Sequence, residues 1–210
     1  MQARRVAAAL FAIASVLSGS CGSLVKQGRS PSYVIINSLT AASGAKPQEF
    51  GNVLASDVVT NVKTTIGGQE VFVPTIFADN GQAIVKLGLK DIGQGATPAS
   101  PTTNNQITLT RYRVVYTRSD GRNREGVDVP YAFDGAITHT VLAEAGSFGF
   151  TLVRVQAKAE APLRALRGGG GAVTISTIAE VTFYGHDQTG TEVTVTGSIS
   201  VNFADWGDPQ

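Results

Sequence analysis

The chain predicts an all-β fold built as an antiparallel β-sandwich, and three observations carry this prediction. Charged residues make up only 16% of the 210 residues, and Gly, Thr, Val and Ala are abundant, as in many all-β proteins. Apolar and polar residues alternate along several segments, which is typical of strands with one buried face. Turn-forming residues separate these segments at short intervals.

The clearest strand pair lies near the C-terminus. Apolar residues occupy every second position of 172–184, and 191–203 repeats the same pattern. The connecting residues 186–190 have the length and the glycine of a hairpin turn. The sequence therefore predicts a C-terminal β-hairpin.

Seven principal strands are expected in all. Their ranges are 33–40, 83–92, 106–118, 136–142, 148–158, 172–184 and 191–203. Within 106–118 the apolar positions change phase between Leu109 and Tyr112. An extra residue returns the following side chains to the core, so we expect a β-bulge near Thr110 or Arg111.

The remaining segments connect these strands. Residues 53–62 and 70–77 form a weaker strand pair, and we expect the range 44–78 to decorate the main domain. The strands 136–142 and 148–158 are expected to form a hairpin. Residues 162–167 predict one short helical turn that begins at proline.

Seven strands with alternating faces resemble an immunoglobulin-like or fibronectin-type sandwich in architecture. The Cys–Trp–Cys core of true immunoglobulin domains is absent, because Trp206 is the only tryptophan and lies beyond the last strand. A β-barrel and a jelly roll are the alternative architectures.

The first residues have the composition of an export signal. Arg4 and Arg5 precede a short apolar run, and small residues follow up to Cys21. The run is shorter than the roughly 20 residues that a membrane-spanning helix needs, which favours a cleaved signal. Cleavage by an ordinary signal peptidase near Ser20 is the alternative to lipidation.

The end of this leader resembles the lipobox of bacterial lipoproteins. Small residues precede Cys21, the only cysteine in the chain, although Ser18 stands where the pattern usually has a large aliphatic residue. The resemblance implies that Cys21 is lipidated and anchors the chain to a membrane. Gly22 after the cysteine implies an outer-membrane address, with the periplasmic or surface face left open.

These features divide the chain into a leader, a tether, one domain and a tail. The expected ranges are 1–20 for the signal peptide, 21–32 for the lipidated cysteine and tether, 33–206 for a single β-sandwich domain, and 207–210 for the tail. Of 17 Lys and Arg residues, two lie in the leader, so 15 remain against 16 Asp and Glu. This balance argues against a nucleic-acid partner.

The chain carries no recognisable catalytic or metal-binding motif. His139 and His186 lie in different elements without a further His or Cys at ligand spacing, so no metal is expected. No serine lies in a G-x-S-x-G elbow. We therefore expect no catalytic residue and no cofactor.

One cluster is a candidate ligand surface. Arg111 and Arg113 alternate with aromatic residues, and Tyr112 and Tyr116 can share one strand face. Basic residues among aromatics can bind acidic glycans. The alternative is a solvated strand face whose arginines are balanced by acidic residues at 120, 125 and 128, with the tyrosines in the core.

The sequence thus predicts a non-catalytic cell-envelope lipoprotein whose β-sandwich acts as a structural, adhesive or ligand-binding module. Its expected partners are the membrane, through Cys21, and an envelope protein or a glycan. One alternative is a carbohydrate-binding or carbohydrate-processing surface protein that uses Tyr112, Tyr116 or Trp206. Another is an accessory subunit of an envelope complex.

Overall fold

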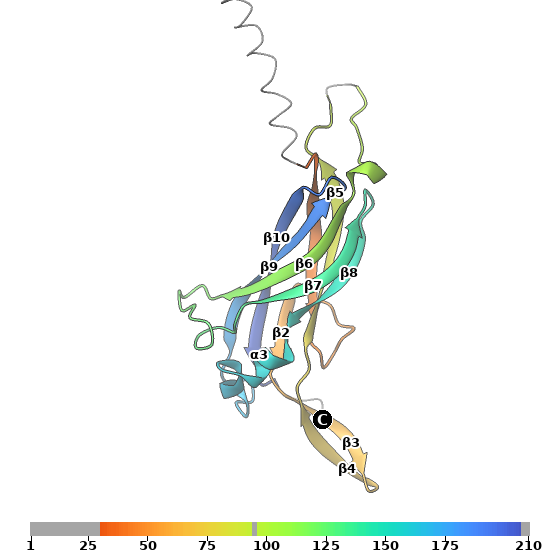
Figure 1. The fold of residues 1–210 in the computed structure, drawn as a ribbon. Helices are drawn as coiled ribbons and strands as arrows, with labels where there is room; N and C mark the ends of the chain where they lie inside the picture. The colour runs from red at the N-terminus through yellow and green to blue at the C-terminus, as the bar shows by residue number, and fades with distance from the viewer. Residues whose placement is uncertain (1–29, 94–95, 207–210) are drawn as a thin grey trace, which may run out of the picture.

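Two β-sheets face each other in the computed structural model, which describes residues 30–93 and 96–206. The three-stranded sheet has the order β1-β5-β8, and the five-stranded sheet has the order β2-β10-β9-β6-β7 (Figure 1). The strands of the first sheet are β1 (Ser32–Ala42), β5 (Asp79–Leu89) and β8 (Gly146–Val153). Those of the second are β2 (Val53–Asp57), β6 (Ile107–Thr117), β7 (Phe133–Val141), β9 (Ile175–Asp187) and β10 (Glu192–Ala204).

This architecture confirms the predicted all-β antiparallel sandwich. Every pairing in the two sheets is antiparallel except that of β2 with β10, which is parallel. The finer resemblance to immunoglobulin-like or fibronectin-type domains stays a prediction. Residues 1–29, 94–95 and 207–210 lie outside the described part, and with them the predicted signal peptide, Cys21, most of the tether and the tail.

The C-terminal hairpin forms as predicted. β9 and β10 pair from Glu192 opposite His186 to Phe203 opposite Ile175. The carboxylate of Asp187 closes the turn, because its Oδ1 accepts hydrogen bonds from the backbone N–H groups of Thr189 and Thr191 at 2.9 and 3.0 Å. A short aspartate side chain that binds nearby backbone is a common turn device.

The predicted bulge in β6 is also present. The register of β6 shifts between Leu109 and Arg111 against both of its neighbours, β7 and β9. Leu109 before the shift and Tyr112 after it are both buried. Gly185 lies opposite Leu109, where a Cβ atom would collide with the backbone of Thr108 and Leu109. The bulge thus places both Leu109 and Tyr112 on the core face of β6.

The range 44–78 is divided in the structure, and the expected pairing of 53–62 with 70–77 is wrong for its first part. Residues 53–57 form β2, which pairs with β10 and places Leu54 in the core. Only β3 (Thr60–Ile66) and β4 (Gln69–Thr75) form a separate two-stranded sheet. This hairpin projects from the end of the sandwich opposite the start of β1 (Figure 1).

The expected hairpin of 136–142 with 148–158 is wrong as well. β7 belongs to the five-stranded sheet and β8 to the three-stranded sheet, so the chain crosses between the sheets at this point. The end of the second range forms the helix α3 (Val155–Ala159) instead of a strand. The predicted helical turn is confirmed as the 3₁₀ helix η2 (Leu163–Leu166).

An aromatic cluster fills the space between the sheets. The ring of Phe183 in β9 meets those of Phe150 and Phe148 in β8 edge-on, with centroids 5.3 and 5.2 Å apart. Tyr112 meets Phe150 at 5.3 Å. Edge-to-face contacts of this kind add to the free energy gained from burying the rings.

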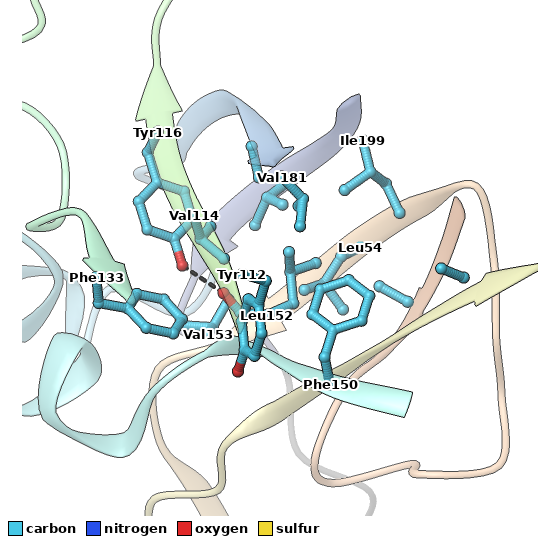
Figure 2. Close-up of a cluster of buried hydrophobic side chains, with 14 of the residues drawn as sticks. Leu54, Tyr112, Val114, Tyr116, Phe133, Phe150, Leu152, Val153, Val181 and Ile199 are labelled. Carbon is cyan, nitrogen blue, oxygen red and sulfur yellow. Dashed lines mark hydrogen bonds between the residues drawn. The ribbon is translucent and has the colours of Figure 1, made fainter. Parts of the chain in front are cut away.

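Two tyrosines of β6 also form hydrogen bonds to the opposite sheet. Tyr116 donates its hydroxyl to the carbonyl of Leu152, 2.5 Å away (Figure 2). The hydroxyl oxygen of Tyr112 accepts the backbone N–H of Thr151 at 3.2 Å. Both partners lie on β8, so these bonds join the two sheets and satisfy polar atoms that the core would otherwise leave unpaired.

Candidate ligand pocket and a buried ion pair

The structure does not bring the four residues of the predicted ligand surface together. Tyr112 and Tyr116 are 4% and 2% exposed and belong to the core, whereas Arg111 and Arg113 lie on the opposite, exposed face of β6. Neighbouring side chains of a strand point to opposite faces. The tyrosines therefore form part of the core, as the alternative interpretation had it, and only the arginines lie on the surface.

The arginines of this region bind carboxylates. Arg111 and Arg113 both bind Asp134 of β7, at 3.2 and 2.7 Å. Arg118 and Arg122 both bind Asp120, and their hydrogen bonds hold the pKa of this carboxyl well below its usual value. Four arginines thus share two carboxylates, so each carboxylate offsets one of the two positive charges beside it.

The histidines also lie apart. His139 packs against the ring of Phe148 with centroids 4.6 Å apart, and burial lowers its pKa. His186 lies at the end of β9, where its Nδ1 is 3.2 Å from the carbonyl oxygen of Asp187. Within residues 30–93 and 96–206, no three His, Cys, Asp or Glu side chains gather as metal ligands would.

A pocket of about 520 Å³ lies between the β1–β2 loop, β2 and the segment after β10. Its apolar walls include Phe50 of the loop, Val53 and Leu54 of β2, and the indole of Trp206. Phe50 and Val53 are 40% and 55% exposed, so their side chains are open to an incoming ligand. Pockets that bind small molecules usually have this size and a mainly apolar lining.

Trp206 supplies a polar group that lacks a partner. Its backbone N–H donates to Oδ1 of Asp57 at 3.0 Å, which fixes the segment after β10 beside β2. Its indole Nε1 is buried and has no hydrogen-bond partner in the described chain. A buried donor without an acceptor is costly, so this atom is an exception among the buried polar groups of the protein.

A buried ion pair lies behind the pocket. Nζ of Lys158 in α3 is 2.8 Å from Oδ1 of Asp79 in β5, and the two side chains are 1% and 0% exposed. Oδ1 also accepts the backbone N–H of Gly44 at 2.8 Å, and Oδ2 accepts the hydroxyl of Ser56 at 2.6 Å. Burial raises the pKa of Asp79, and Lys158 and these hydrogen bonds oppose that rise.

The ion pair and the pocket are parts of one structure. Gly44 lies between two loop residues that line the pocket, and Ser56 lies between two β2 residues that line it. The carboxylate of Asp79 therefore holds two walls of the pocket in place through its hydrogen bonds to Gly44 and Ser56. The sequence carried no signal for this arrangement, because Asp79, Ser56 and Lys158 are distant in the chain and match no motif.

The fold and the pocket define an all-β sandwich protein with one candidate site for a small ligand. Among the described residues, neither α3 nor any other helix has the length and apolar character needed to cross a bilayer. Comparison with protein-family models, with curated proteins and with solved structures gave no match. The functional proposal therefore rests on this chain's own residues.

Proposed function

We propose that the protein is a non-catalytic, lipid-anchored protein of the cell envelope whose β-sandwich binds a small, mainly apolar ligand. The observation that carries this proposal is the pocket between the β1–β2 loop and Trp206. Its apolar walls match the body of such a ligand.

The position of the pocket suits a tethered protein. The expected anchor, Cys21, precedes β1 by a short tether, and the pocket takes in Ala41 and Ser43 at the far end of β1. A strand of this length spans about 35 Å. A chain held at Cys21 can therefore present the pocket away from the bilayer, together with the β3–β4 hairpin (Figure 1).

Binding of an apolar fluorescent dye tests the pocket. Trp206 is the only tryptophan in the chain, so its emission reports on this site. We expect anilinonaphthalene sulfonate to quench Trp206 by energy transfer, and Phe50→Ala to weaken this binding about tenfold, because part of one aromatic ring no longer covers the dye.

Phe72→Ala is the matched control, because Phe72 is an exposed phenylalanine of the β3–β4 hairpin outside the pocket lining. We expect it to leave the quenching of Trp206 unchanged. Equal weakening by both substitutions would mean that the dye binds elsewhere. Absence of saturable quenching in the unmodified protein would contradict the proposed ligand site.

Fractionation of cells tests the anchor. We expect the unmodified chain in the membrane fraction and Cys21→Ser in the soluble fraction, because a protein without its lipid loses the hydrophobic free energy of the buried acyl chains. Ser23→Ala, two residues further on, is the control and is expected to stay with the membrane. Membrane retention of Cys21→Ser would contradict the lipoprotein proposal.

A further inference from the structure

We propose that Lys158 and Asp79 become joined by an intramolecular isopeptide bond that the folded protein forms without another enzyme. This modification is independent of the proposed ligand and of the membrane anchor. It would link α3 covalently to the start of β5.

The geometry presents the reactants to each other. Nζ of Lys158 lies 2.8 Å from Oδ1 of Asp79, so the carboxyl carbon is only one bond further away. Attack requires Nζ to leave this hydrogen bond and approach Cγ from above the carboxyl plane. Two groups held in this way react as parts of one molecule, with effective concentrations far above any in solution.

The surroundings favour the reactive protonation states. Amide formation needs a neutral amine and a protonated carboxyl group. The two side chains are 1% and 0% exposed, and an apolar interior disfavours separated charges. Burial raises the pKa of Asp79, and this favours the protonated carboxyl group that amide formation needs.

The step balances without an added reagent. Nζ attacks Cγ of Asp79, the bond from Cγ to Oδ2 breaks, and Oδ2 leaves as water with the carboxyl proton and one amine proton. The backbone N–H of Gly44, 2.8 Å from Oδ1, stabilises the negative charge that develops on that oxygen. The hydroxyl of Ser56, 2.6 Å from Oδ2, can pass a proton to the leaving oxygen.

The bond would cross-link the chain covalently, which an intramolecular disulfide cannot do in this sequence. Cys21 is the only cysteine. A link from Asp79 to Lys158 closes a loop that contains β5, β6, β7 and β8, which are strands of both sheets. Closing a long loop restricts the unfolded chain more than closing a short one.

Peptide mapping of the full-length protein, purified from the envelope and denatured before digestion, tests the proposal. Trypsin should release peptide 64–86, which carries Asp79, joined to peptide 155–164, which carries Lys158, with a combined mass lower by one water. Recovery of unlinked 64–86 together with 155–158 and 159–164, with Lys158 open to amine reagents in all molecules, would overturn the proposal.

Two lysine variants make the test specific. Lys158→Arg keeps the positive charge but cannot form the bond, and we expect it to abolish the branched peptide. Lys63→Arg is the control, because Lys63 and Glu70 form a pair at 2.6 Å that is exposed to solvent and not enclosed in the core. It should leave the branched peptide unchanged. A branched product that persists in Lys158→Arg would overturn the assignment.

Discussion

Replacement of Lys158 by methionine is expected to lower the free energy of unfolding by about 3–5 kcal/mol. Asp79 would remain fully buried and would lose the positive charge that stands 2.8 Å from its carboxylate. Removal of one member of a buried pair costs this much because the other charge is left uncompensated in a medium of low polarity. Equilibrium unfolding in denaturant measures the loss.

The pH dependence of this variant has a defined sign. Burial raises the pKa of Asp79 above the ordinary 3.8, and without Lys158 less remains to oppose that rise. The folded state then keeps its proton at pH values where the unfolded chain has already lost it. The free energy of unfolding of Lys158→Met should therefore fall as pH rises from 3.8 to the raised pKa of the folded state.

Two controls separate the lost charge partner from the lost side chain. The double variant with Asp79→Leu and Lys158→Met removes both charges, so we expect it to be more stable than the single variant Lys158→Met and to lose this pH dependence. Lys63→Met breaks an exposed pair and should cost at most about 1 kcal/mol. A single variant Lys158→Met as stable as the unmodified protein would contradict the expected role of the pair.

The strands could be predicted because their signal is local. Alternation along β9 and β10 reports which side chains a single sheet face buries, and it needs no knowledge of the partner sheet. The same reasoning located the β6 bulge, since only an inserted residue reconciles the positions of Leu109 and Tyr112 with one core face.

The pairing of strands could not be predicted, because it depends on contacts distant in sequence. The segment 53–57 has only five residues, and their sequence does not indicate that they pair in parallel with β10 near the other end of the chain. β7 and β8 are consecutive strands with a short connection, which normally indicates a hairpin. The connection instead crosses from one sheet to the other.

The candidate site was missed for a related reason, except for Trp206, which the sequence analysis named as one possible ligand residue. Sequence reasoning singled out Tyr112 and Tyr116 for their chemistry, although the apolar neighbours two residues apart place them on the core face of β6. The pocket takes its walls from a loop, a short strand and the only tryptophan, and none of these forms a motif with the others. Asp79 and Lys158 meet only because α3 replaces the expected end of a strand.

Phe183→Ala is expected to lower the free energy of unfolding by about 3–5 kcal/mol. This loss is comparable to the one expected for Lys158→Met. The ring of Phe183 is fully buried and meets aromatic rings of the opposite sheet at 5.2 and 5.3 Å. Rings from both sheets surround the site, and the strands that carry them are fixed by hydrogen bonds. The space left by the ring cannot close completely, so the variant keeps a cavity.

Unfolding in denaturant measures this loss, with Phe72→Ala as the matched control. Phe72 is 55% exposed on the β3–β4 hairpin, so its removal should change the free energy of unfolding by no more than about 0.5 kcal/mol. The slope of the free energy against denaturant should stay the same in both variants, because the surface exposed on unfolding is nearly unchanged. Equal effects of the two substitutions would contradict the placement of Phe183 at the centre of the core.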